Sequence, residues 1–76
     1  MSAEITDRRP PWKAWAGKGL PPIMVGQTVE RRYRDGEEQS LKVRECHLAP
    51  WMWEHRGDAQ DITAYRVVCG IDGKPL

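Results

Sequence analysis

The chain contains no phenylalanine, only two cysteines and no long apolar run, and each absence limits what it can be. A membrane-spanning helix needs about 18 or more consecutive apolar residues, so none is predicted. The N-terminal stretch lacks the apolar segment of a secretion signal, so we expect a cytoplasmic protein. In that reducing compartment, Cys46 and Cys69 are expected to be free thiols rather than a disulfide.

An excess of charge of either sign is also absent, since 12 Lys and Arg residues face 11 Asp and Glu residues. DNA-binding domains of this size usually carry a positive excess, which releases counterions from phosphate. A protein that imitates DNA would carry an acidic excess instead. The balance of charges therefore favours a protein partner. With 76 residues, the chain has room for one domain with a small core.

Residues that could hold a metal or perform catalysis are few. Cys46, His47, His55 and Cys69 are ligand types of zinc, but they lack the short spacings of structural zinc sites. Catalysis by a cysteine paired with His55 would need a concave pocket, lined also by Asp61, for which so small a sheet has little room. The sequence therefore predicts no metal site, no cofactor and no enzyme activity.

The N-terminal third is expected to be irregular. Residues 1–11 mix charges with two prolines, which predicts a flexible tail before a single small β domain at residues 12–76. Within this domain, glycines and a Pro-Pro pair rule out a long helix in residues 12–26. We expect that stretch to form an ordered tryptophan-rich arm that lies against a sheet.

Alternating residues on both sides of Asp35-Gly36 are typical of a β-hairpin. A two-residue loop would mix apolar and charged side chains on one face of the hairpin. A three-residue loop that begins at Asp35 instead places Val29 opposite Val43, and it pairs Glu30 with Lys42 on the other face. Because a slip by one residue would turn every side chain to the wrong face, we expect the three-residue loop.

Two features are expected between the hairpin and the last strand. Pro50 interrupts any regular strand, so a short strand or loop is predicted there, with Trp51 and Trp53 on the same side. Residues 55–60 have the composition of a turn. In this turn His55 is expected to lie over a tryptophan or to bond to an aspartate, Asp58 or Asp61.

Residues 61–69 are rich in β-forming residues and have apolar side chains on both faces. Simple alternation places Ile62 and Ala64 on one face, and Tyr65 and Val67 on the other. Apolar residues on both faces indicate a central strand, or a strand whose second face is covered by the arm.

These segments together predict a mainly β fold, a small curved antiparallel sheet of three to four strands with an irregular Trp-rich N-terminal arm. Because phenylalanine is absent, the tryptophans must supply most of the large apolar area of the core. Trp53 is expected to be a core residue for this reason.

Several short motifs follow one another along the chain, namely Trp15-x-Gly17, Tyr33-Arg34-Asp35-Gly36, Trp53-x-His55-x-Gly57 and Asp61-Ile62-x-Ala64-Tyr65-Arg66-Val67. In this order they resemble a small domain of unknown function found in many bacteriophage and prophage proteins. The signature of that domain is similar to W-x-H followed by D-I-x-A-Y-R-V. The resemblance implies a phage or prophage accessory protein in the cytoplasm of a bacterial host cell. It implies no reaction, because none is assigned to the domain.

Trp, Tyr and Arg side chains dominate the energetic centres of protein interfaces. We therefore expect a non-catalytic protein that binds a host factor or another phage component. The predicted partner-binding residues are Trp12, Trp15, Arg31, Tyr33 and Trp51. Two alternatives remain open, namely a small nucleic-acid-binding module that uses the Arg31–Arg34 strand and a self-assembling structural phage protein that pairs its edge strands.

Overall fold

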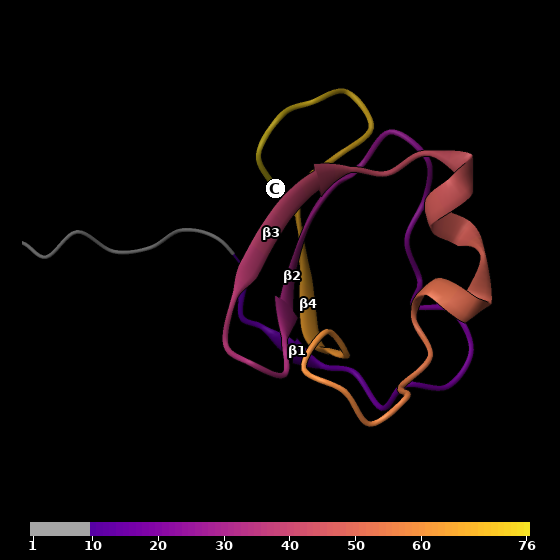
Figure 1. Ribbon diagram of the computed structural model, residues 1–76. Coiled ribbons are helices and arrows are strands. Elements are labelled where there is room, and N and C mark those ends of the chain that lie inside the picture. The colour runs from indigo at the N-terminus through magenta and orange to yellow at the C-terminus, as the bar shows by residue number, and fades with distance from the viewer. Residues whose placement is uncertain (1–9) are drawn as a thin grey trace, which may run out of the picture.

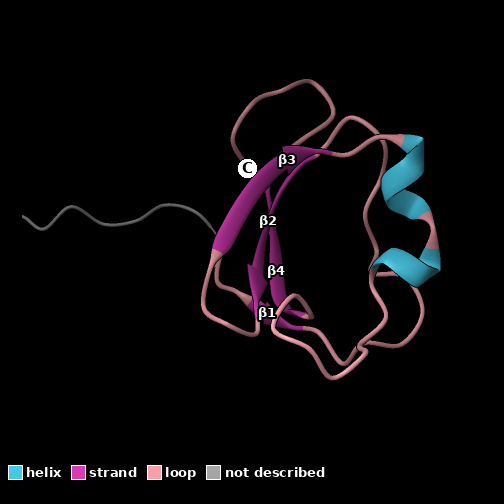
Figure 2. Ribbon diagram, viewed as in Figure 1, coloured by secondary structure: helices cyan, strands magenta, loops and turns pink. Residues whose placement is uncertain are grey.

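The structure, a computed structural model, describes residues 10–76 (Figure 1). All four strands belong to one open antiparallel sheet with the order β1-β4-β2-β3. The strands are β1 (Lys13–Ala14), β2 (Thr28–Tyr33), β3 (Glu38–Lys42) and β4 (Ile62–Cys69). The predicted mainly β fold class is confirmed (Figure 2). Except for Pro10 and Pro11, the predicted tail lies outside the described residues.

Strand β4 is an inner strand between β1 and β2, as its two apolar faces predicted. Its side chains do not alternate simply, because the pairing with β2 shifts between Arg32, opposite Ala64, and Tyr33, opposite Ile62. This bulge places one extra residue of β4 between the two pairs. Ile62 consequently packs in the same core cluster as Tyr65. The predicted placement of Ile62 and Tyr65 on opposite faces is therefore wrong.

The β2–β3 hairpin has a three-residue loop, but the loop occupies residues 34–36, one residue earlier than predicted. Gly36 has a φ of 92° and its N–H donates to the carbonyl of Tyr33 at 2.9 Å. The N–H of Tyr33 in turn donates to the carbonyl of Glu37 at 2.8 Å. Loops of this kind require the left-handed residue in the last position, which glycine adopts without strain. The glycine therefore ends the loop.

The earlier loop changes the predicted partners across the hairpin but not the faces. Val29 lies opposite Leu41 rather than Val43, and Glu30 lies opposite Ser40 rather than Lys42. Both pairings differ from the predicted ones by two residues, and side chains two residues apart share a face of a strand. Glu30 and Lys42 therefore do not lie opposite each other as predicted. The side chains of both strands still lie on the predicted faces of the sheet.

Residues 45–52 form two short 3₁₀ helices, η1 (Glu45–Leu48) and η2 (Pro50–Met52). Pro50 takes the first position of η2, where its missing N–H costs nothing. Trp51 is 61% exposed and Trp53 is fully buried, so the prediction that they share a side is wrong. Side chains two residues apart point the same way in a strand, but they do not in a helix with three residues per turn. Among residues 10–76, no helix has the length and apolarity needed to cross a bilayer.

The core lies on one face of the sheet, enclosed by the N-terminal arm and the two 3₁₀ helices (Figure 1). Trp53 is at its centre, and its ring meets those of Trp15 and Tyr65 edge to face at centroid distances of 6.1 and 6.3 Å. The indole N–H of Trp53 donates to the carbonyl of His47 at 2.7 Å, which satisfies its polar atom. The prediction that Trp53 belongs to the core is confirmed.

Candidate functional site

Trp12 directly precedes β1 and lies on the sheet face opposite the core, against Arg32 of β2 and Arg66 of β4. The guanidinium carbons of Arg32 and Arg66 are 4.3 and 4.2 Å from the centre of its ring. At these distances the cations interact with the face of the indole. Arg66 also forms an ion pair with Glu30 at 2.6 Å. Trp12 therefore covers charged side chains and is only partly open to a partner.

Trp15 is half-buried on the core side of the sheet. Its indole N–H donates to the carbonyl of Trp53 at 2.6 Å, and its ring packs against Tyr65 at a centroid distance of 5.9 Å. These contacts hold the N-terminal arm onto the core. Trp15 is therefore a contact of the core, whereas the three remaining predicted residues share a pocket.

Those three residues, Arg31, Tyr33 and Trp51, line one pocket of about 250 Å³. We call it the Arg31 pocket. Its lining consists of Arg31, Tyr33, Trp51, Met52, Glu54, Arg56, Asp58, Gln60, Asp61 and Ile62. The sequence indicated three of these positions from their residue type. It did not indicate that the loop after Trp53 would supply half of the wall.

Arg31 projects from β2 onto the core face and is 8% exposed. Its guanidinium carbon is 5.4 Å from the ring centre of Trp53 and 5.7 Å from that of Tyr33. One nitrogen, Nη2, donates to the Tyr33 hydroxyl at 3.0 Å and to the amide oxygen of Gln39. Another, Nε, is buried without any acceptor. Within residues 10–76, no carboxylate forms an ion pair with this buried cation.

The charge of Arg31 also acts on His47 in the 3₁₀ helix η1. Burial, and then the charges of Arg31 and Arg44, lower the pKa of His47 from its ordinary value. The neutral imidazole accepts the backbone N–H of Arg44 on Nδ1 at 2.9 Å. Glu45, the acidic residue of η1, is exposed and forms no ion pair with Arg31 within the described residues.

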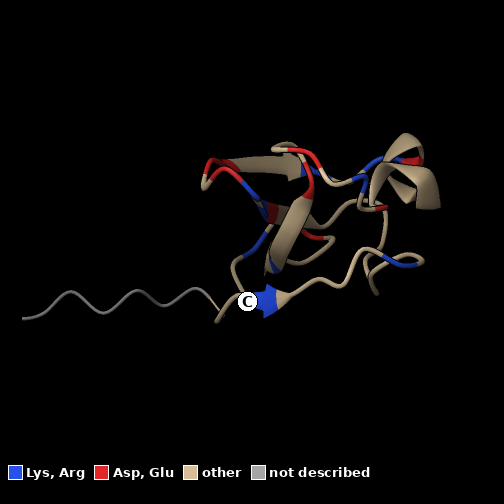
Figure 3. Ribbon diagram, turned by 60° about the horizontal axis from the view of Figure 1, so that its bottom comes forward, with Lys and Arg blue, Asp and Glu red and all other residues tan. Residues whose placement is uncertain are grey.

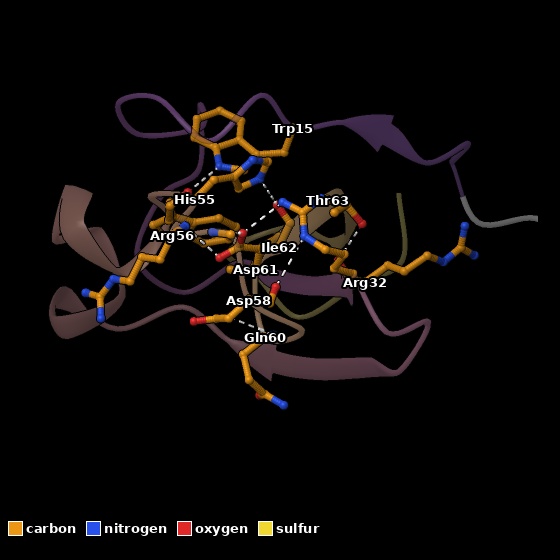
Figure 4. A network of polar contacts seen from close by, with 12 residues as sticks. Trp15, Arg32, His55, Arg56, Asp58, Gln60, Asp61, Ile62 and Thr63 are labelled. Carbon is orange, nitrogen blue, oxygen red and sulfur yellow. Dashed lines mark hydrogen bonds and ion pairs between the residues drawn. The ribbon is translucent and has the colours of Figure 1, made fainter.

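Asp61 also lines the pocket, is 4% exposed and belongs to a network of polar contacts (Figure 4). Its carboxylate accepts the backbone N–H groups of Arg56 and Gly57 and the Nη2 of Arg34, each at 2.8 Å. The amide of Arg56, with help from Arg34 and Gly57, holds the pKa of Asp61 well below its ordinary range, although burial acts in the other direction. Asp61 therefore shapes the loop, and its charge is already matched.

The sequence did not reveal this role of Asp61. The only local signal is an acidic residue that follows a glycine turn and begins a strand, where loop N–H groups need an acceptor. Which N–H groups it would accept depends on the path of residues 54–60, and that path is set by contacts with the hairpin loop. Arg34, for example, donates through Nε to the carbonyl of Asp58 at 3.2 Å.

His55 does not line the pocket, and its ring lies against Gly17 of the arm. Its Nε2 is 2.5 Å from the carbonyl oxygen of Ile62, and its backbone N–H donates to the carbonyl of Gly17 at 3.3 Å. The predicted bond to Asp58 or Asp61 is therefore wrong. Asp61 is already engaged by the loop N–H groups, so the imidazole turns to the strand carbonyl.

The two cysteines of the described residues form no disulfide. Cys46 is exposed and Cys69 is half-buried, both as free thiols. Of the three residues that an enzyme would need here, only Asp61 lines the Arg31 pocket, whereas Cys46 and His55 do not. Over residues 10–76, no group of three or more His, Cys, Asp or Glu side chains is placed to hold a metal ion. The pocket offers groups that bind, namely two guanidinium groups, two aromatic rings and loop carboxylates.

Comparisons of the chain with protein-family models, with curated protein sequences and with solved structures find no match. The function is therefore argued from the residues of the chain itself.

Proposed function

We propose that this chain is a non-catalytic accessory protein that binds another protein through the Arg31 pocket and the exposed indole of Trp51. The sequence resemblance adds to this proposal a bacteriophage or prophage origin and action in the cytoplasm of a bacterial host. The partner is then a host factor or another phage component.

The observation that carries the proposal is the position of Trp51. Its side chain is 61% exposed, yet it stands directly at a pocket lined by Arg31 and Tyr33. The core does not need this ring, since Trp53 fills the centre. Burying an aromatic ring of this size removes about 150–250 Å² from water, and Trp, Tyr and Arg clustered at one place are typical of an interface centre.

No observation favours the nucleic-acid alternative. Arg32 forms an ion pair with Glu38 at 2.9 Å and Arg34 forms one with Asp61 at 2.8 Å. Figure 3 shows basic and acidic segments interspersed along the chain. Binding along a nucleic-acid backbone requires several cations that are not already paired. Of the three arginines in residues 31–34, two are paired with carboxylates.

Self-assembly remains a second candidate because β3 is an edge strand of the sheet. An antiparallel pair of two β3 strands centred on Ser40 would place Glu38 of each copy opposite Lys42 of the other, which are attractive neighbours. Sedimentation at two protein concentrations tests this directly. A concentration-dependent dimer that Lys42→Glu abolishes would support it, and a monomer at both concentrations would reject it.

Affinity purification of the tagged chain from bacterial lysate tests the leading proposal. It is performed with and without nuclease at moderate salt, and retained proteins are identified by mass spectrometry. We expect one protein to be retained after nuclease treatment. Material that disappears with nuclease would reject protein binding in favour of nucleic acid.

Two matched variants show whether the proposed surface is responsible. Trp51→Ala removes the exposed ring at the pocket, and Met24→Ala removes an apolar side chain that is 55% exposed and does not line the pocket. Retention should be lost with Trp51→Ala and kept with Met24→Ala. Equal retention by both variants would contradict a role for this surface.

A further inference from the structure

We infer that the Arg31 pocket receives one carboxylate, supplied by an Asp or Glu side chain of the partner protein. The inference rests on the proposed function and names the chemistry of the partner segment. It depends on the state of Arg31, on the charges around the pocket and on the size of the pocket.

Arg31 is a buried cation that the described chain does not neutralise. It is 8% exposed, its Nε lacks an acceptor, and its hydrogen bonds from Nη2 go to neutral oxygens of Tyr33 and Gln39. A buried charge without a counter-charge is costly to the folded state. A carboxylate that binds beside it removes part of that cost and gains a charge-assisted hydrogen bond. Part of the free energy of binding therefore comes from relieving the cost of the unpaired charge, which is present in the unbound protein.

The surrounding charges select an anion with a single charge. Asp61 is matched by Arg34 at 2.8 Å, so it leaves Arg31 unbalanced. Glu54 and Asp58 are exposed on the lining of the same pocket. They would repel a doubly charged phosphate, and they would repel the successive phosphates of a nucleic acid even more. A single carboxylate brings half the negative charge of such a phosphate, and its counter-charge is the buried Arg31, whereas Glu54 and Asp58 are exposed and share the lining with the exposed Arg56.

The size and apolar lining of the pocket favour a side chain over a larger ligand. The volume of about 250 Å³ lies just below the roughly 300–1,000 Å³ of pockets that enclose drug-sized molecules. Trp51 and Met52 line the same pocket. They give an apolar surface for a residue next to the carboxylate in the partner chain. An acidic residue beside an aliphatic one therefore matches the site.

Peptide titrations observed by NMR test the inference on the intact chain. The probes are a capped pentapeptide with a central glutamate flanked by leucines and the same peptide with glutamine in its place. The signals followed are the Arg31 Nε–H and the Trp51 indole N–H. We expect saturable shifts of both with the glutamate peptide, and binding at least about tenfold weaker with the glutamine peptide, as the loss of one charge-assisted hydrogen bond predicts.

Equal affinity for the two peptides, or an Arg31 signal that does not move at about 10 mM peptide, well above a millimolar Kd, would overturn the inference. Inorganic phosphate is titrated in parallel. Phosphate that shifts the Arg31 signal more strongly than the glutamate peptide would also overturn it, because a site for a doubly charged anion would then be present.

Two variants test whether the glutamate peptide binds at Arg31, and neither requires a large change in the core. Arg31→Lys keeps the cation but removes the fork of donors, so we expect at least about tenfold weaker binding of the glutamate peptide. Arg56→Gln removes an exposed arginine of the same pocket and should change the affinity by less than about threefold, as for a screened surface charge. The opposite order would overturn the assignment to Arg31. The peptide comparison on the unaltered chain remains decisive if Arg31→Lys fails to fold.

Failure of this inference and failure of the proposed function give different results. A protein captured through Trp51 together with an unmoved Arg31 signal would overturn only the inference. A carboxylate-specific shift at Arg31, combined with no protein retained in the affinity purification, would overturn only the proposed protein partner.

Discussion

Gly17 and the ring of His55 occupy adjoining space where the N-terminal arm meets the loop before β4. Gly17 has a φ of 81°, and a Cβ at this position would lie 2.2 Å from Cγ of His55. Two separate constraints therefore require glycine here. The first is the left-handed backbone, which L side chains rarely adopt, and the second is the close approach of the imidazole.

Gly17→Ala and Gly19→Ala separate these two constraints. Gly19 has a similar φ of 75° but no atom within 4 Å of an added Cβ. We expect Gly19→Ala to cost about 1–2 kcal/mol from the backbone alone, and Gly17→Ala to cost about 1–3 kcal/mol more from overpacking. Urea denaturation of the two variants measures the difference. Similar losses of stability would mean that His55 does not restrict the position.

Asp61 is the residue whose protonation should matter most for stability. Its pKa in the folded state lies well below the value of about 3.9 for an unfolded aspartate. The stabilisation is thus fully present above about pH 5 and is lost as the pH falls toward the folded pKa. Asp61→Asn should be less stable than the wild type at pH 7, with a smaller loss of unfolding free energy between about pH 5 and pH 2. Urea denaturation across this range checks it, and parallel pH curves would speak against the role of Asp61.

At the scale of the elements, β2 carries acidic and basic side chains on the sheet face opposite the core. Glu30 pairs with Arg66 on β4 at 2.6 Å, with side-chain exposures of 15% and 8%. Arg32 pairs with Glu38 on β3 at 2.9 Å, with exposures of 39% and 50%. The first pair joins the two inner strands and the second joins β2 to the edge. The two ion pairs can be compared directly because they differ in how deeply they are buried.

Glu30→Gln should therefore destabilise the protein much more than Glu38→Gln. Removing one partner of a buried pair costs about 3–5 kcal/mol, whereas an exposed pair contributes about 0–1 kcal/mol and is screened by salt. Thermal or urea denaturation at low and moderate salt compares the two variants. A comparable cost for both would show that burial of the Glu30 pair is not what stabilises the contact between β2 and β4.

At the scale of the whole molecule, one core cluster joins the arm, the sheet and the segment that contains the 3₁₀ helices. Trp53 contacts or bonds to groups in each of these parts, among them Trp15, Tyr65 and the carbonyl of His47. A chain of this length with a single core is expected to lose all of these contacts together.

Unfolding should accordingly be a single cooperative transition. Tryptophan fluorescence, which responds to the burial of Trp53, and far-UV circular dichroism, which responds to the sheet, should give the same midpoint in urea. Trp53→Ala should cost about 3–5 kcal/mol, a large part of the stability of so small a domain. Separate midpoints for the two signals would indicate that the arm and the sheet unfold independently.

The amino-acid sequence by itself determined the β class, the central place of β4, the hairpin around Gly36 and the burial of Trp53. These depend on patterns within a few residues, such as β-forming runs, turn residues and the lack of other large aromatics. Only the tertiary structure decided the bulge near Ile62, the separation of Trp51 from Trp53 and the pairing of each arginine. Arg31, Arg32 and Arg34 are similar in the sequence, and their different states arise from Gln39, Glu38 and Asp61, which belong to other elements. Long-range contacts of this kind leave no local pattern, so the unbalanced charge at Arg31 became visible only in the fold.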